Sequence, residues 1–162
     1  MEQTNQMETY IVLLEASLVK KRGVLDQLID LSNQQEAQIN DDMNDDSFNR
    51  IIDEKDNLIK TILQLDEGFE QIYQRIKDEF TINQKNHQSE IKKLQELIKE
   101  VIDRGVQLQV TERRNKAKFE AYLQTKRKGI KNVKLNSQTA TSYYKNMANQ
   151  NQQESYFFDK KK

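Results

Sequence analysis

Residues 48–80 read FNRIIDEKDNLIKTILQLDEGFEQIYQRIKDEF, and this stretch decides the fold. Its large apolar residues recur at steps of three and four, from Phe48 through Ile62 and Phe69 to Phe80. Such steps place side chains on one face of an α-helix, so the stretch predicts one long amphipathic helix. The apolar stripe is broad, which is typical of a helix in the middle of a bundle with neighbours on both sides.

A similar pattern lies on either side of this stretch. The N-terminal seam consists of Met7, Ile11, Leu14, Leu18, Leu25, Leu28 and Ile39. It is interrupted by polar residues at Lys21, Ser32 and Gln35. The C-terminal seam consists of Ile91, Leu94, Ile98, Val101, Gly105 and Leu108 and, after two polar positions, Phe119 and Tyr122. At about 1.5 Å per residue, each of the three segments would span roughly 50–60 Å.

Two polar runs separate the segments. Residues 40–47, NDDMNDDS, are rich in residues that cap helices, and we expect a turn that ends in an N-cap near Asp46 or Ser47. The four aspartates of this run approach a calcium loop in composition. The glycine and the terminal glutamate of an EF-hand are absent, so we expect capping and no metal site. Residues 83–88, NQKNHQ, predict a second turn, although without Gly or Pro a continuous helix stays open.

Three helices of matched length joined by short turns must run up, down and up. The sequence therefore predicts an all-α fold: an elongated antiparallel three-helix coiled-coil bundle over residues 1–128. The absence of Pro fits long uninterrupted helices. Gly129, preceded by a cationic last turn, is expected to end the third helix. Residues 129–162 form a second unit, a basic and amphiphilic tail that is either flexible or helical.

Composition and sequence pattern indicate in which cellular compartment the protein resides. Apolar residues make up 35% of the chain and charged residues 32%, and there is no Cys. Without Cys, stability cannot depend on an oxidising environment. Residues 1–8 lack the cationic start and apolar run of a signal peptide, and no stretch approaches the roughly 20 apolar residues of a membrane span. We therefore expect a cytoplasmic protein with no membrane partner.

The net charge is zero but unevenly distributed. Of 26 Lys and Arg and 26 Asp and Glu, 13 cations and 4 acids follow Val110, which leaves 13 cations and 22 acids before it. The basic end, with Phe119 and Tyr122 interleaved, has features of nucleic-acid binding. The opposing interpretation places both aromatic residues in the core and leaves the cations solvated or facing an acidic partner. Because the rest of the chain is acidic, we expect no nucleic-acid partner.

Residue types for catalysis are scarce. His87 is the single histidine and lies in a polar turn, so we expect a solvated side chain. Without Cys, an ordinary zinc site cannot be built, and the four glycines are isolated and form no phosphate loop. We therefore expect no enzymatic activity, no metal and no cofactor.

Apolar islands in the basic end predict a partner-binding segment, because a tail evolved only for solubility would not need them. The candidate contacts are Phe119, Tyr122, Ile130, Val133, Leu135, Tyr143, Tyr144 and Met147. For Phe119 and Tyr122 the alternative is a place in the bundle core. For the later residues the alternative is a disordered tail or a helix that packs back on its own bundle.

Four stretches resemble the FlgN/FliT-type flagellar export chaperones. They are ETYIVLLEASLVKKRGVLDQLIDL at 8–31, the segment 48–70, NSQTATSYYKNM at 136–147 and YFFDKKK at 156–162. The resemblance implies a cytosolic chaperone of type III export that binds hook-associated (FlgK/FlgL-like) proteins and prevents their premature assembly. It also implies client binding by the C-terminal part.

Several alternatives remain open at this stage. A FliT-like member would instead hold the filament cap protein, and export-apparatus components are further partners that the resemblance admits. A self-associating structural coiled-coil protein and a nucleic-acid-associated regulator fit the same composition. The sequence does not decide between a monomer and a dimer.

Overall fold

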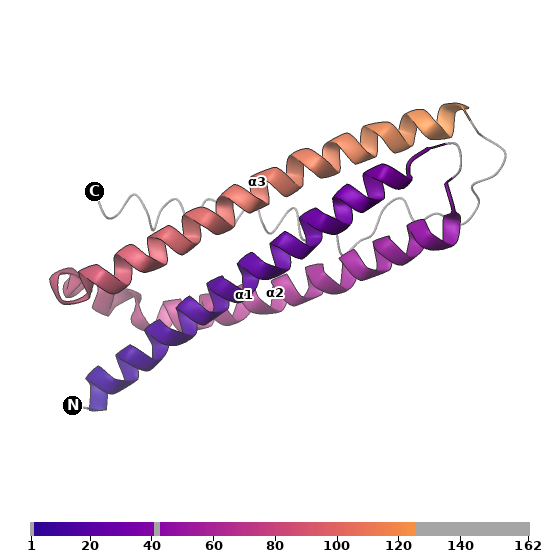
Figure 1. The fold of residues 1–162 in the computed structure, drawn as a ribbon. Helices are drawn as coiled ribbons and strands as arrows, with labels where there is room; N and C mark the ends of the chain where they lie inside the picture. The colour runs from indigo at the N-terminus through magenta and orange to yellow at the C-terminus, as the bar shows by residue number, and fades with distance from the viewer. Residues whose placement is uncertain (1, 41–42, 126–162) are drawn as a thin grey trace.

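The structure is a computed structural model that describes residues 2–40 and 43–125. Within these ranges it consists of three long α-helices, α1 (Glu2–Gln38), α2 (Asp45–Ile82) and α3 (Gln88–Thr125), and one short 3₁₀ helix, η1 (Gln84–His87). The helices run up, down and up, as Figure 1 shows. The expected all-α class is thus confirmed, and the described ranges contain no strand.

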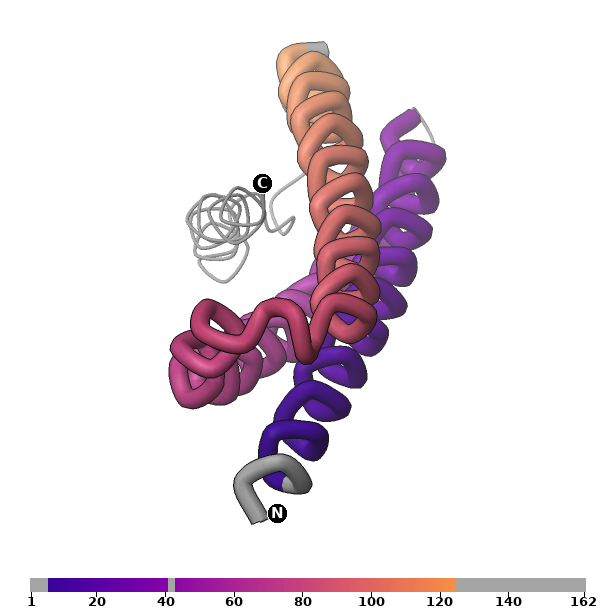
Figure 2. The backbone as a smooth tube through the Cα atoms, turned by 90° about the vertical axis from the view of Figure 1, so that its left-hand side faces the viewer, coloured from indigo at the N-terminus to yellow at the C-terminus, as the bar shows by residue number. Residues whose placement is uncertain are grey.

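The middle helix is α1 and not α2. Along their described lengths, α1 packs against both α2 and α3, whereas no Cα atom of α2 comes within 8 Å of one in α3. Figure 2 shows α3 running beside α1 over much of its length. The expectation that the broad stripe of residues 48–80 marks the middle helix is therefore wrong. Large side chains such as Phe48 and Lys55 bridge from α2 to α3, so the stripe is broad without close backbone contact.

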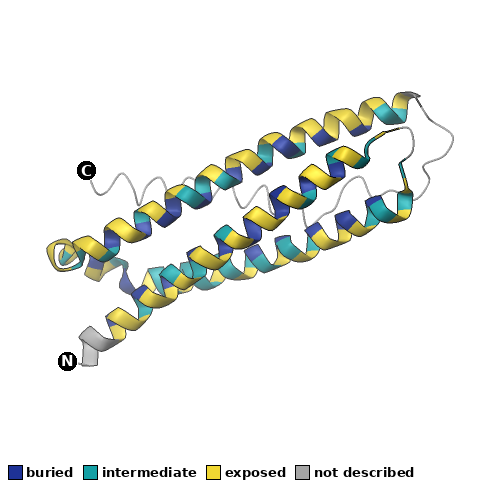
Figure 3. Cartoon of the chain, in the orientation of Figure 1, coloured by how far each residue is buried: buried dark blue, intermediate teal, exposed yellow. Residues whose placement is uncertain are grey.

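The core lies along the facing sides of the helices, where Figure 3 shows rows of buried residues. The largest fully buried apolar side chains are Leu14, Leu25, Leu28, Ile62, Leu94, Ile98 and Leu108. All of them belong to the three apolar seams read from the sequence. Because burying a Leu or Ile side chain stabilises a fold by about 1.5–3 kcal/mol, these rows supply most of the driving force for packing.

The polar interruptions of the first seam have partners on other helices. Lys21 is 5% exposed, and its Nζ lies 2.8 Å from Asp66 Oδ1 of α2. Ser32 and Gln35 are also buried and face polar groups of α2 and α3. A buried cation or hydroxyl is tolerated only where a partner satisfies it, so these positions constrain how the helices align.

The first turn caps α2 earlier than expected. Asn44 is the N-cap, and its Oδ1 accepts a hydrogen bond from the backbone N–H of Ser47 at 3.1 Å. The helix therefore begins at Asp45, and the expected N-cap near Asp46 or Ser47 is wrong by two or three residues. Asp45 and Asp46 instead occupy the first turn, where carboxylates interact favourably with the helix dipole.

The second turn is present, so the continuous helix is excluded. Asn83 ends α2 by donating its N–H to the Glu79 carbonyl at 2.8 Å, and η1 leads into α3. His87 is not solvated as expected: its side chain is 15% exposed and its ring meets Phe80 edge-on at 5.8 Å. The imidazole thus helps to close this end of the bundle.

No helix in the described part of the chain combines the length and the apolar character that crossing a membrane requires.

Candidate partner-binding site

A small hydrophobic cluster, here called the end cluster, closes the bundle where α3 leads toward the basic C-terminal segment. It consists of buried Phe48, Ile52 and Phe119 with half-buried Ile39, Met43, Tyr122 and Leu123 packed against them. The helices α2 and α3 and the connection between α1 and α2 contribute to it. The end cluster therefore ties the last turns of α3 to the rest of the fold.

Stacked aromatic rings form the centre of the end cluster. The Phe48 and Phe119 ring centroids are 5.1 Å apart with an interplanar angle of 16°, and Tyr122 stacks on Phe119 at 6.4 Å. Offset stacks of this kind contribute about 0.5–1.5 kcal/mol beyond the burial of the rings. Phe119 is only 4% exposed, whereas Tyr122 is half-buried at the rim.

Of the eight candidate contact residues, the structure describes two. Phe119 occupies the core position that the sequence offered as its alternative, and Tyr122 is half-buried. The remaining candidates lie outside the described residues: Ile130, Val133, Leu135, Tyr143, Tyr144 and Met147. The boundary between the bundle and the tail at residues 128 and 129 lies outside them as well.

Beneath the end cluster, five polar side chains form what we call the polar layer: Ser32, Gln35, Lys55, Glu112 and Asn115. Lys55 Nζ donates to Gln35 Oε1 at 2.8 Å and forms an ion pair with Glu112. Ser32 Oγ donates to the same carboxylate. Asn115 Nδ2 donates to the Ser32 carbonyl at 2.8 Å, which completes a network through all three helices.

The polar layer separates the end cluster from the main core on every helix. It lies between Leu28 of α1 and Ile39 of the following connection, between Ile59 and Ile52 on α2, and between Leu108 and Phe119 on α3. Buried polar groups of this kind fix the alignment of helices, because a shifted register leaves a charge unpaired. The sequence signalled Ser32 and Gln35 as breaks in the first seam, but nothing in it singled out Lys55 or Glu112.

A second set of charges ties α1 to α3 beside the end cluster. Glu36 accepts hydrogen bonds from Arg114 Nη2 at 2.8 Å and from Lys118 Nζ at 2.5 Å. The hydrogen bonds from Lys118 and from Arg114 lower the pKa of the Glu36 carboxyl below its ordinary value. Two cations of the basic end are thus engaged within the bundle, while Arg113 and Lys116 are exposed on the same helix.

The Glu36 interaction predicts a pH-dependent contribution to stability. A lowered folded-state pKa stabilises the fold above the ordinary glutamate pKa and loses that contribution as the pH falls through the folded value. We expect Glu36→Gln to lower the melting temperature at pH 7, and the difference from the wild type to shrink progressively as the pH falls below the ordinary glutamate value of about 4.3. Thermal unfolding followed by circular dichroism across this range measures it. Glu120→Gln, at an exposed glutamate of α3, is the control, and an equal effect there would contradict the assignment.

Comparison of the chain with protein-family models, curated proteins and solved structures finds no match. The resemblance to FlgN/FliT-type chaperones therefore stays a prediction from the sequence. Among the residues that the structure places, no group of three or more His, Cys, Asp or Glu side chains is arranged to hold a metal ion. What the described part of the site offers is the half-buried Tyr122 at the edge of a buried aromatic cluster, with the exposed cations Arg113 and Lys116 on the same helix.

Proposed function

We propose that the chain is a cytosolic, non-enzymatic chaperone of flagellar type III export that binds a hook-associated (FlgK/FlgL-like) protein and prevents its premature assembly. The observation that supports this proposal is the arrangement of residues at the end of the bundle where α3 finishes. There, the last turns of α3 pack into an aromatic cluster, and in the sequence a basic segment with apolar islands at residues 130–158 follows. The identity of the client comes from the sequence resemblance.

The polar layer gives the bundle the properties of a scaffold. It pins the three helices in register just below the end cluster, so the last described turns of α3 are held at a defined place. A fixed bundle end next to an amphiphilic segment is an effective arrangement for capturing a helical client, because the bundle end loses little conformational freedom on binding.

Charge supports the same division of roles. The part of the chain after Val110 carries 13 cations and 4 acids, whereas the part before it carries 13 cations and 22 acids. An acidic surface on the client would be attracted to the basic end and repelled by the rest of the bundle. The client is thereby directed to the end cluster and the residues that follow it.

A capture experiment tests the proposal. Full-length protein and a form cut after Lys128 are used as baits against lysate from the source organism, and the retained proteins are identified. We expect a hook-associated protein to be captured by the full-length form alone, because the cut removes six of the eight candidate contacts. Circular dichroism of the cut form should show that the bundle stays folded.

The other outcomes are decisive as well. Capture of a filament cap protein would assign the FliT-like role in place of the FlgK/FlgL-like one. Equal capture by both forms would remove the C-terminal segment from the site. Recovery of nucleic acid, or of the bait alone, would contradict the chaperone proposal.

A further inference from the structure

The N-terminal half of α1 is apolar on two opposite faces. One face carries the core residues Met7, Ile11, Leu14 and Leu18. The other face carries Val12, Leu13, Ala16 and Val19, with Val12 61% exposed and both Leu13 and Val19 45% exposed. A helix that is apolar all round is normally buried on all sides, so the outer face of α1 has the composition of a contact surface.

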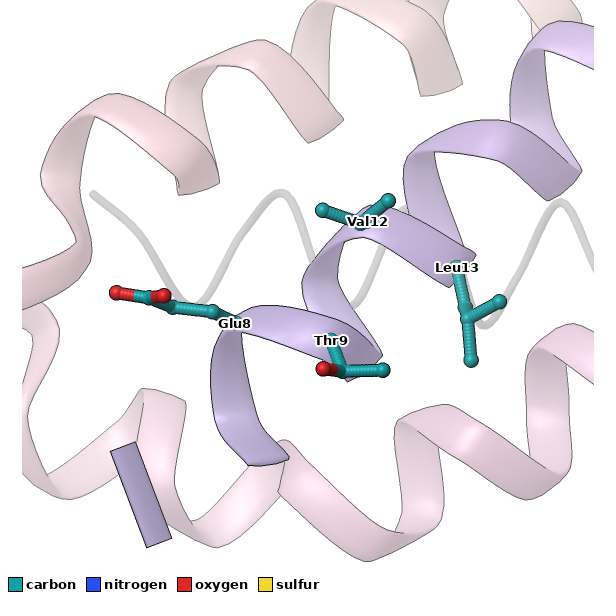
Figure 4. A pocket seen from close by; sticks show the side chains of 4 residues that line it. All are labelled: Glu8, Thr9, Val12 and Leu13. Atoms are coloured by element: carbon teal, nitrogen blue, oxygen red, sulfur yellow. The ribbon is translucent and has the colours of Figure 1, made fainter. Parts of the chain in front are cut away.

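This outer face is hollowed in two adjoining places. Glu8, Thr9, Val12 and Leu13 line the first hollow, and Figure 4 shows their side chains on consecutive turns of α1. The second hollow lies between α1 and α3 and is lined by Val12, Ala16, Val19 and Leu97, with Glu15, Lys20, Arg22 and Lys93 around them. Val12 belongs to both hollows. We call the two together the outer groove.

The exposed apolar residues are concentrated and not scattered. Six large apolar side chains are exposed in the described residues, and three of them lie within eight positions of α1. Of the others, Ile82 ends α2, and Val106 and Val110 form a separate pair on α3. Single exposed apolar residues need no explanation, but a contiguous apolar groove with a polar rim marks an interaction site.

The shape of the outer groove fits a helix. Val12, Ala16 and Val19 follow the spacing of four and three that packs against a partner helix in coiled coils. The small Ala16 allows a partner backbone to approach, and a Cβ atom added at the exposed Gly23 would meet no atom within 4 Å. From Thr9 to Gly23 the face extends for roughly 20 Å, or about four helical turns.

The charged residues at the rim of the outer groove determine which kind of partner helix fits it. Three cations, Lys20, Arg22 and Lys93, line the outer groove, against two carboxylates, Glu8 in the first hollow and Glu15 in the second. Lys93 pairs with Glu15 at 3.2 Å and Arg22 pairs with Glu100, yet the Lys93 and Arg22 side chains remain 64% and 32% exposed. The rim therefore favours acidic groups on whatever binds, and it disfavours a second copy of this groove, which would bring like charges together.

We propose that the outer groove binds an amphipathic α-helix of a partner protein whose apolar stripe is flanked by Asp and Glu. The apolar stripe covers Val12, Ala16 and Val19, and the flanking acids meet Lys20, Arg22 and Lys93. This is the helix-in-groove mode of recognition. The site is separate from the end cluster and does not depend on the C-terminal segment, so it stands or falls independently of the proposed function.

A synthetic helical peptide tests this site. It has about 21 residues, roughly 30 Å when helical, with Leu at spacings of four and three, Glu on both flanks and one Trp. Because the chain contains no Trp, the fluorescence belongs to the peptide alone. Titration with the full-length protein should show saturable binding, and replacing the flanking Glu by Lys should weaken it by about tenfold or more.

Matched variants locate the binding. Val12→Glu with Val19→Glu should weaken binding of the Glu-flanked peptide by about tenfold or more, and the milder Val12→Ser with Val19→Ser should also weaken it. The control is Val106→Glu with Val110→Glu, which alters two similarly exposed valines of α3 and should change the affinity by less than about twofold. Circular dichroism should show wild-type helicity in all three variants.

Three results would overturn the proposal. The first is peptide affinity that the α1 variants leave unchanged, and the second is an equal loss in the α3 control. The third is sedimentation of the full-length protein as a dimer that Val12→Glu with Val19→Glu converts to a monomer, because a second copy would then be the occupant of the groove.

Discussion

Replacing Lys55 by alanine is expected to destabilise the bundle by about 3–5 kcal/mol, because it leaves the Glu112 carboxylate without its cation in a largely buried site. The Lys55 and Glu112 side chains are only 9% and 19% exposed, so water cannot replace the lost ammonium group easily. Gln35 would lose a hydrogen-bond donor as well. Urea unfolding of the full-length protein, followed by circular dichroism at 222 nm, measures the change in the free energy of unfolding.

Two further variants separate pairing from packing. Lys60→Ala, at an exposed lysine of the same helix, should change stability by less than about 0.5 kcal/mol. Lys55→Met combined with Glu112→Leu removes both charges and should recover most of the loss, as other buried ion pairs replaced by apolar residues do. If Lys55→Ala costs no more than Lys60→Ala, the polar layer does not hold the helices together.

Replacing Phe119 by alanine is expected to cost about 3–5 kcal/mol, since it removes a buried ring and the stack with Phe48. Phe119→Leu keeps most of the volume and should cost less than about 1.5 kcal/mol. Ile82→Ala, at a side chain that is 77% exposed, is the matched control and should have little effect. Denaturant unfolding of the three variants gives the comparison, and a negligible loss for Phe119→Ala would show that the end cluster is not part of the folded bundle.

The helices themselves could be predicted because their periodicity is local. The steps from Met7 to Leu28 and from Ile91 to Leu108 identify the faces that the structure buries. Periodicity within one helix gives no distance to another, however. The sequence therefore could not show that α1 lies between its neighbours, and the breadth of the α2 stripe pointed to the wrong helix.

Polar pairs between helices could not be predicted either, because a sequence pattern within one helix gives no distance to another. Lys21 stood out as a break in a seam, but its pairing with Asp66 depends on how far α1 is shifted along α2, which composition does not encode. The sequence pattern did not predict that Lys55 is buried, because a lysine in a charged stretch usually lies on a solvated face. Only the folded arrangement brings it beside Glu112.

The two candidate surfaces also differ in how far the sequence could predict them. Phe119 sat on a seam, so its place in the core was a stated alternative that the structure realises. The outer groove was missed because Val12 and Val19 flank a stripe of the same helix, where apolar residues look like an extension of the core. Their exposure follows from the positions of α2 and α3, which pack against other sides of α1 and leave this face open.

Co-elution tests the central claim, the binding of a flagellar client through the C-terminal segment, most directly. The full-length protein is mixed with a purified hook–filament junction protein of the same organism and separated by size-exclusion chromatography with light scattering. We predict a stable complex that is lost when the chain is cut after Lys128 and kept in Val12→Glu with Val19→Glu. Separate elution of the two full-length proteins at micromolar concentration would contradict the account.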